Sequence, residues 1–383
     1  MALSNTVGQL PWRERGVWLA GDTHAHYRNV GVARLAAEAS RFCDFISITS
    51  HSHRPEFLAA QHGEVVAARR IFPNLLIFHG VEWACPVGCH ATVLIERSRS
   101  EDRVLKEFLR RYDRFAGGSE EHSVAQALRG MRFLRRQARE TESIVILNHP
   151  SYGSSAAPAD LRALAAAGGA CIGLEGARGN QSRQPGSEIE PMVRRVGGLY
   201  DALLAEGCRW SVVAASDFHA HVAEGGRTFW PGEFARTFVY CPDRSYAGVL
   251  AGLRAGAVYF VHGDIIGPLQ FTACTDRGMA MMGETIRVPR GTSVEFVLDC
   301  VEHATLDRVE FISNHRSRDV FTVARRSRRR RVGPWSRFRF PVSEAQRDFY
   351  VRVRGCARQV RKPHFGTVGT VWFYTSAIRV EVV

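Results

Sequence analysis

Residues with metal-binding side chains follow short apolar segments at five places between residues 22 and 219. Each apolar segment is rich in aliphatic and β-branched residues, which is typical of a buried strand. The segments lead into DTHAH (22–26), SHSH (50–53), GVE (80–82), NHP (148–150) and SDFH (216–219). In a parallel barrel the carboxyl ends of all strands open onto one face, so we expect these side chains to converge there.

The spacing within these clusters indicates metal binding. Residues i and i+2 of an extended strand point to the same side, so His24 and His26 can bind one ion together, as can Asp217 and His219. Imidazole nitrogen and carboxylate oxygen together suit zinc, manganese or iron. Glu82 carries two oxygens and is able to bridge two ions. We therefore predict a site for two or three divalent metal ions.

Such a site favours hydrolysis by a metal-bound hydroxide. A water molecule shared by the ions would have a lowered pKa, and the ions would also bind the substrate oxygen on which charge develops. His149, His53 and Asp217 are the candidates for passing a proton to the leaving group, and the sequence does not choose among them. Neither a Gly-rich phosphate loop nor a Gly-x-Ser-x-Gly elbow is present, which disfavours a nucleotide-driven or serine-nucleophile mechanism.

Strands and helices are expected to alternate from about residue 17 to 262, which predicts a parallel α/β barrel or a doubly wound sheet. The expected strands are 17–20, 45–49, 75–79, 92–95, 144–147, 172–174, 211–214 and 238–240. The expected helices are 32–39, 56–70, 102–112, 123–140, 159–166, 188–206 and 244–255.

Near residue 265 the helical periodicity stops. The strand-like segments that follow are 269–274, 293–301, 308–313, 319–323, 336–341, 348–353 and 377–382. Their spacing predicts a small antiparallel β-sandwich. We therefore expect two domains, a metallohydrolase barrel over 1–266 and the sandwich over 267–383.

Seven motifs together resemble the polymerase and histidinol phosphatase (PHP) superfamily. They are DTHAH (22–26), DFISITSH (44–51), GVEW (80–83), GCHATVLI (88–95), NHP (148–150), GLEGARGN (173–180) and SDFHAH (216–221). Their order matches the family, and the resemblance implies a distorted (β/α)7 barrel that holds two or three metal ions. Segments 252–263 and 373–378 are similar to the branch that contains carbaryl hydrolase and carries a β-sandwich tail.

The resemblance also implies a set of metal ligands, with Glu82 as the bridging carboxylate. The set is His24, His26, His51, Glu82, His90, His149, Asp217 and His219. Asp22 resembles a residue that orients a ligand histidine, and Glu175 and Asn180 match a strand end near the site. The chain departs from the family at Ser50, where an Asp is usual, and in 27–31, which lacks the usual Asp or His. These departures leave a site with two ions, or one, open.

The substrate is expected to be a small anionic molecule, with a phosphoester favoured. Arg28, Arg54, Arg178 and Arg227 lie near the predicted ligands in the sequence, and an arginine clamps an anionic group well. We take Arg178 as the arginine that stabilises developing charge. Carbamate or amide hydrolysis is the alternative, because the similar branch includes carbamate cleavage.

Other classes of function are less favoured. Ser50 and the missing ligand after His26 leave open a non-catalytic metal-binding or interaction protein. The net charge of +13 favours anionic partners, but the arginine run at 325–331 lacks the aromatic residues typical of a nucleic-acid surface. No apolar stretch approaches the roughly 20 residues of a membrane span, and no signal peptide is evident, so a cytoplasmic location is expected. The nine cysteines are irregularly spaced, which predicts reduced thiols; the oligomeric state stays open.

Overall fold

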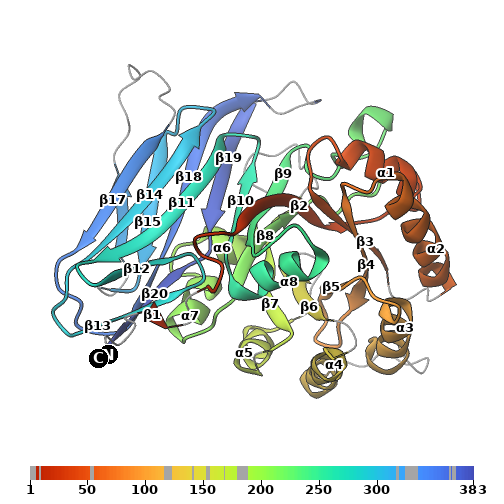
Figure 1. The fold of residues 1–383 in the computed structure, drawn as a ribbon, viewed down its shortest axis with the longest axis horizontal. Helices are drawn as coiled ribbons and strands as arrows, with labels where there is room; N and C mark the ends of the chain where they lie inside the picture. Colours follow the sequence, from red (N-terminus) through yellow and green to blue (C-terminus); the bar gives the residue numbers. More distant parts are fainter. Residues whose placement is uncertain are drawn as a thin grey trace.

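The protein is a mixed α/β molecule with one large curled sheet and a smaller second sheet, as Figure 1 shows for the computed structural model. The structure describes residues 6–7, 10–51, 56–115, 123–139, 142–151, 156–167, 169–178, 189–315, 319–323, 335–361, 364 and 368–383.

Nine strands form the part of the large sheet that carries the predicted ligands. They are β2 (Val17–Ala25), β3 (Phe45–His51), β4 (Leu76–Ala84), β5 (His90–Ile95), β6 (Ser143–Asn148), β7 (Cys171–Arg178), β8 (Ser211–Ala215), β9 (Ala235–Cys241) and β10 (Val258–His262). Their order in the sheet is β10-β9-β2-β3-β4-β5-β6-β7-β8. Strands β2 to β4 are parallel, and so are β6 to β8.

The prediction that all these strands are parallel is wrong for β5 and β9. Strand β5 is antiparallel to both β4 and β6, and β9 is antiparallel to β2. The cause at β5 is the short connection 85–89, because a parallel partner needs a crossover of a dozen or more residues.

The large sheet curls until the end of β8 meets β2 again. The backbone N–H of Asp217 donates to the His24 carbonyl at 3.0 Å, and that of His26 donates to the Phe218 carbonyl at 2.9 Å. The Thr237 hydroxyl of β9 accepts from the Ala214 N–H at 2.8 Å and donates to its carbonyl at 2.7 Å. The hydrogen bonds of Asp217 and Phe218 with His24 and His26 place residues 216–219 beside the end of β2.

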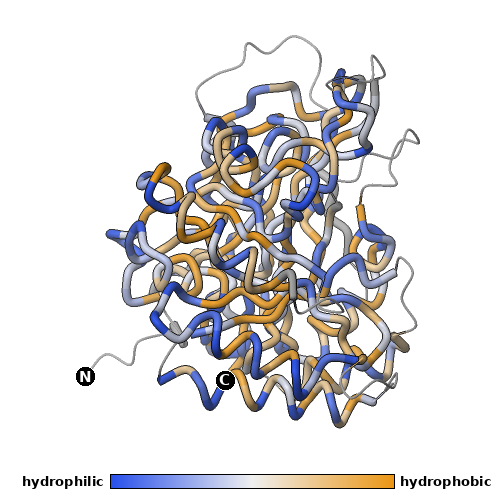
Figure 2. The backbone as a smooth tube through the Cα atoms, turned by 90° about the vertical axis from the view of Figure 1, so that its right-hand side faces the viewer, coloured by the Kyte–Doolittle hydropathy of each residue, from blue (hydrophilic) through white to orange (hydrophobic). Residues whose placement is uncertain are grey.

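Helices α1 to α5 lie along the outside of the curled sheet (Figure 1). The helices are α1 (Val32–Ala39), α2 (Glu56–Ile71), α3 (Glu101–Tyr112), α4 (Val124–Gln137), α5 (Pro158–Ala167), α6 (Pro191–Arg194), α7 (Leu199–Ala205) and α8 (Tyr246–Ala255). Hydrophilic and hydrophobic residues alternate along the outer helical turns in Figure 2, as is typical of helices that cover a core on one side. None of the described helices combines the length and hydrophobicity that a transmembrane segment requires.

The helix expected over 188–206 is two short helices instead. Helix α6 starts at Pro191, and α7 starts at Leu199. Helix α6 ends at Arg194 because Arg195 is extended (φ −74°, ψ 115°), and Gly197 then has φ 68°, a left-handed conformation that glycine adopts without strain.

Eleven further strands precede or follow this part. They are β1 (Thr6–Val7), β11 (Ile266–Thr275), β12 (Gly278–Met281), β13 (Thr285–Val288), β14 (Val294–Glu302), β15 (Arg308–Ser313), β16 (Asp319–Val323), β17 (Ser336–Val342), β18 (Phe349–Arg361), β19 (Val368–Thr375) and β20 (Ile378–Val382). Strands β12-β11-β14-β17 form the second sheet, whereas β13-β20-β18-β19 join the large sheet through β10. Phe271 of β11, Phe311 of β15 and Val353 of β18 belong to one hydrophobic cluster, so the two sheets share a core.

The sheet is continuous across residue 266, because β10 pairs with β19 from Tyr259↔Thr375 to Val261↔Phe373. Strands β10, β12, β13 and β19 were not expected from the sequence. None of the nine cysteines forms a disulfide bond in the structure.

Candidate metal centre

The eight predicted ligands lie together at one end of the curled sheet. His24 and His26 are at the end of β2, His51 ends β3, Glu82 is near the end of β4, and the others follow at β5, β6 and β8. His90 is the first residue of β5, and the antiparallel direction of that strand pairs it with Ala84 and Asn148. Although β5 is antiparallel to both of its neighbours, its histidine therefore lies at the same end of the sheet as the other predicted ligands.

Glu82 is buried in the middle of this cluster, with only 1 % of its surface exposed. Five imidazole nitrogens surround its two oxygens: His90 Nδ1 at 2.9 Å and His149 Nε2 at 3.4 Å from Oε1, and His51 Nδ1 at 2.8 Å, His26 Nε2 at 3.3 Å and His24 Nε2 at 3.6 Å from Oε2. Oε2 nevertheless has no hydrogen bond of acceptable geometry among the described residues. The three nitrogens near Oε2 therefore surround this oxygen without being aligned as donors to it.

Asp217 provides a second carboxylate on the other side of the HxH pair. Its Oδ1 lies 3.2 Å from His26 Nε2, 3.4 Å from His24 Nε2 and 3.6 Å from His219 Nδ1. Asp217 and His149 both have positive φ, 45° and 26°, which is uncommon for residues other than glycine. Strained backbone of this kind is typical of functional sites, where the surrounding structure holds it in place.

Three overlapping groups of side chains have ligand atoms within 4.8 Å of one another. They are His24–His26–Asp217, His51–Glu82–His90 and His26–His51–His219. Nitrogen and carboxylate ligands bind zinc at about 2.0–2.2 Å, so atoms this close to one another can share an ion after small rotations of the side chains. Because His26 and His51 each belong to two groups, the arrangement suits more than one ion.

The electrostatics of the cluster favour added positive charge. Burial alone would raise the pKa of Glu82, but the neighbouring His24 and the other imidazoles hold it well below its usual value. Burial opposes protonation of His24, yet Glu82, Asp217 and Glu175 raise its pKa well above the ordinary value. Burial likewise opposes protonation of His149, and the hydrogen bond to Glu82 and the nearby carboxylates raise its pKa to about 9. The buried negative charge of the carboxylates therefore favours the binding of cations among these side chains.

Glu175 holds two members of the cluster in position. His24 Nδ1 donates to Glu175 Oε1 at 2.8 Å, which turns Nε2 toward Glu82, and the His149 backbone N–H donates to Oε2 at 3.0 Å. A carboxylate that accepts from the far nitrogen of a histidine is a frequent partner of metal-binding imidazoles. The sequence placed Glu175 near the site without giving it a role.

Asp22 acts on the backbone rather than on an imidazole. Its Oδ1 accepts from the His24 N–H and its Oδ2 from the Ser216 N–H, both at 2.9 Å, so it ties the end of β8 to β2. Burial raises the pKa of Asp22 to about 7 despite these hydrogen bonds. The family resemblance implied that Asp22 orients a ligand histidine; in the structure Asp22 holds the His24 backbone, and Glu175 contacts the His24 imidazole.

Asn148 is a positioning residue that sequence reasoning missed. Its Oδ1 accepts from the Thr92 N–H at 2.9 Å, and its Nδ2 donates to Glu82 Oε1 at 3.3 Å. Its place directly before His149 in the NHP motif was the available signal.

Several predicted residues lie outside what the structure describes. These are His53 and Arg54, the Arg178 side chain, Asn180 and the arginine run 325–331. Their roles stay predictions. Ser50, where the family has Asp, is described: its backbone N–H donates to Gln61 Oε1 at 3.0 Å, and its buried hydroxyl has no hydrogen-bond partner among the described residues.

A separate group, which the sequence did not indicate, consists of His221, Glu233 and His364. Glu233 accepts from His221 Nε2 at 3.0 Å and from His364 Nε2 at 2.7 Å. The Ala223 N–H donates to His221 Nδ1 at 3.3 Å, which leaves Nε2 as the protonated nitrogen. This group is therefore satisfied as a hydrogen-bonded triad.

Comparisons with known proteins assign this chain to no family. No protein-family model and no curated protein matches the chain. Among solved structures, the chain is similar to a two-domain protein from Bacteroides vulgatus that is described as containing a predicted PHP-like metal-dependent phosphoesterase. The identity is 14 %, the TM-score is 0.44, and the match covers 94 % of this chain and 97 % of that one. A likeness this weak assigns neither a family nor an activity.

Proposed function

We propose that this protein is a metal-dependent hydrolase that cleaves a phosphoester or a similar anionic small molecule. The observation that carries the proposal is the buried Glu82 carboxylate with five imidazole nitrogens within 3.6 Å of its oxygens. A merely structural cluster would pair these groups by aligned hydrogen bonds, whereas Glu82 Oε2 has none among the described residues. The residues present thus fit a group of divalent ions.

Divalent ions bound there would lower the pKa of a water molecule and polarise the substrate oxygen. The protein's own residues have defined parts. Glu175 fixes the orientation of His24, and Asn148 fixes Glu82. His149 keeps 9 % of its surface exposed and is proposed to give a proton to the leaving group, with Asp217 and His53 as the other candidates. Arg178 is proposed to bind the anionic group of the substrate.

The finer assignment rests on the sequence motifs. We propose that residues 1–266 form a distorted (β/α)7 barrel of the PHP type and that residues 267–383 form a β-sandwich, as in the branch that contains carbaryl hydrolase. Two or three ions of zinc, manganese or iron are proposed for the centre. The paired groups around Glu82 and around Asp217 support more than one ion.

The test is turnover of two substrate panels by protein loaded with manganese, zinc or iron. We expect hydrolysis of phosphoesters, and loss of at least 100-fold in kcat/KM in Glu82→Gln, since that change removes the shared carboxylate charge. His303→Ala is the matched control, because His303 pairs with Asp264 at 3.3 Å and belongs to no ligand group. Turnover of carbamates alone would replace the phosphoester proposal by the carbamate one. Bound metal without turnover of either panel would overturn the hydrolase proposal.

A further inference from the structure

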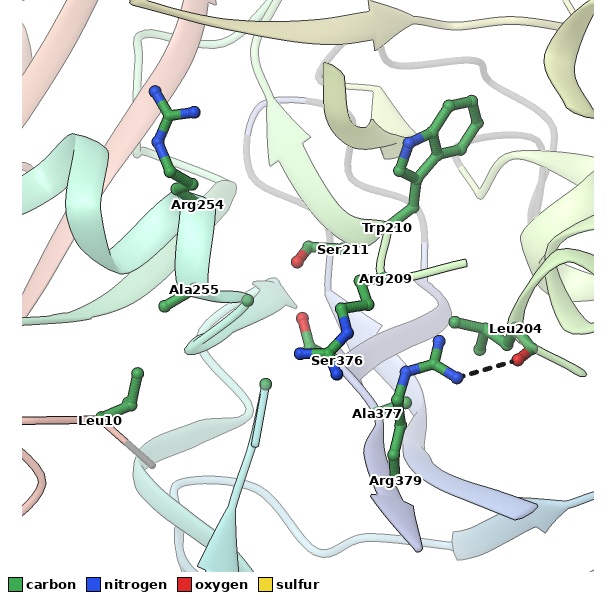
Figure 3. Close-up of a pocket in the computed structure, with 12 residues that line it drawn as sticks. Leu10, Leu204, Arg209, Trp210, Ser211, Arg254, Ala255, Ser376, Ala377 and Arg379 are labelled. Carbon is green, nitrogen blue, oxygen red and sulfur yellow. Dashed lines mark hydrogen bonds between the residues drawn. The ribbon is translucent and has the colours of Figure 1, made fainter. Parts of the chain in front are cut away.

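A cavity of about 130 Å³ lies where β8 begins, α8 ends and β20 begins (Figure 3). Its lining residues are Leu10, Leu204, Arg209, Trp210, Ser211, Arg254, Ala255, Gly256, Gly283, Ser376, Ala377 and Arg379. Arg209 and Trp210 directly precede β8, whereas Asp217 and His219 follow it. The strand separates the two places by roughly 15–20 Å, so the cavity is distinct from the metal centre.

Two hydrogen-bond donors without partners lie at this cavity. Ser376 Oγ and Arg379 Nη2 are buried and have no hydrogen-bond partner among the described residues, and Ser376 is only 2 % exposed. The Trp210 ring, in contrast, extends away from Arg209 and Arg379 in Figure 3. A buried donor without a partner costs free energy, and two at one cavity indicate a ligand that accepts from both of them.

The cavity also has unbalanced positive charge. Its lining contains three arginines and no carboxylate. Arg254 is paired with Glu142 at 2.7 Å, and its guanidinium points away from Arg209 in Figure 3. Burial lowers the pKa of Arg379, and the charge of Arg209 lowers it further. Glu381 raises this pKa by a smaller amount, and Glu381 also pairs with Arg287 at 2.9 Å.

The two remaining guanidinium groups have few partners of their own. Arg379 Nη1 donates to the Leu204 carbonyl at 3.1 Å, and Arg209 Nη2 donates to Thr285 Oγ1 at 3.3 Å, so both acceptors are uncharged. A guanidinium has five N–H donors in a planar fork that fits the oxygens of a phosphate or carboxylate.

We propose that this cavity binds a phosphate-sized oxyanion through Arg209, Arg379 and the Ser376 hydroxyl. Guanidinium groups only donate, so the ligand must be an acceptor with several oxygens, which excludes a metal ion or an amine. A phosphate group meets this requirement either as the free ion or as the end of a phosphomonoester. The site is independent of the hydrolase proposed above.

The test is calorimetric titration of the metal-loaded protein with inorganic phosphate. Ser376→Ala removes one neutral donor and should weaken binding about 3- to 10-fold, and Arg209→Gln removes a charged donor and should weaken it about 10- to 100-fold. Arg379→Lys tests the second guanidinium. If Arg379→Lys does not fold, Arg209→Gln still tests the proposal. Arg337→Gln is the matched control, because Arg337 is exposed and pairs with Asp299 at 2.8 Å.

His24→Ala separates this site from the metal centre. Phosphate binding at the cavity should persist in His24→Ala and fall in Ser376→Ala and Arg209→Gln. Methylphosphonate distinguishes the two sources: affinity equal to that of phosphate supports a phosphomonoester, and affinity at least 10-fold weaker supports the free ion. Phosphate binding that is absent, or that all cavity variants retain unchanged, would overturn the proposal.

Discussion

At the scale of single residues, the metal centre depends on carboxylates that are too buried to be stable on their own. Glu82 and Glu175 are each 1 % exposed and Asp217 is 7 % exposed. Moving a carboxylate from water into such a place costs several kcal/mol unless a nearby positive charge offsets it. Protonated imidazoles provide part of that positive charge. Divalent ions bound between the side chains would provide it without protonation of the closely spaced imidazole nitrogens.

Glu175→Gln tests whether Glu175 positions the ligand histidine. The amide retains the size of the side chain but loses the charge that holds His24 Nδ1 at 2.8 Å. We expect metal affinity to fall about 10- to 100-fold, measured by competition with a chromogenic chelator. Glu206→Gln is the control, because Glu206 is exposed and pairs with Arg162. Unchanged metal affinity in Glu175→Gln would show that the contact has no bearing on the centre.

The lowered pKa of Asp102 predicts how the stability of the fold depends on pH. Burial raises its pKa, but His79 and Lys106, whose Nζ lies 2.6 Å away, outweigh this and lower it from 3.8 to about 2. The charged form therefore stabilises the fold fully above pH 4, and this contribution is lost as the pH falls toward 2. Since Asp102 is partly exposed, the contribution is at most about 1 kcal/mol. Urea unfolding should show Asp102→Asn less stable at pH 6 and equal to the wild type near pH 2. A difference that does not vary with pH would contradict this.

At the scale of elements, the direction of one strand decides which end of it contributes to the centre. Strand β5 enters the cluster with its first residue, His90, whereas β3 enters with its last, His51. The short turn between β4 and β5 forces this reversal. Since the antiparallel register sets His90 opposite Ala84 and Asn148, the ligand reaches the same end as in a parallel arrangement.

The sequence predicted those elements that depend on the apolar pattern of neighbouring residues. Helix α1 and strands β15 and β16 have the bounds expected from the apolar pattern, because burial of one face or of both shows directly in nearby residues. The ligand cluster was foreseen for the same reason, since each histidine or carboxylate adjoins its own apolar strand. Strand direction at β5 and the parallel pairing of β13 with β20 depend on contacts between distant segments, which local patterns do not encode. The cavity donors Arg209 and Arg379 were missed for that reason.

Gly21 is a position where an element's packing requires the absence of a side chain. A Cβ there would lie 2.4 Å from the Phe45 carbonyl oxygen in β3, so β2 and β3 would have to separate next to Asp22. We expect Gly21→Ala to destabilise the protein by about 1–3 kcal/mol in urea unfolding. Gly63→Ala in α2 is the matched control, because nothing lies within 4 Å and alanine favours the helix. Equal stability of Gly21→Ala and wild type would show that the strands adjust without cost.

At the scale of the whole molecule, a buried ion pair joins α7 to β18. Arg352 donates to Asp201 Oδ1 at 2.6 Å and to Oδ2 at 2.9 Å, and its side chain is 1 % exposed. Together with the β10–β19 pairing, this contact binds the C-terminal strands to the part that carries the metal centre.

Asp201→Ala should lower the free energy of unfolding by about 3–5 kcal/mol, because it leaves the Arg352 charge buried without a counter-charge. The double variant Asp201→Leu, Arg352→Met removes both charges and should recover most of that loss. Urea unfolding of both variants and of the exposed control Glu206→Ala gives the comparison. A double variant no more stable than Asp201→Ala would mean that packing, rather than the buried charge, is responsible.

The most direct test of the central claim is the metal content of the protein purified without chelator, measured by elemental mass spectrometry for wild type and His24→Ala. We expect two or three equivalents of zinc, manganese or iron in the wild type and loss of at least one equivalent in the variant. A single equivalent would restrict the mechanism to one ion. A folded wild-type protein that binds no divalent metal, even when metal is supplied, would rule out a metal centre at these residues.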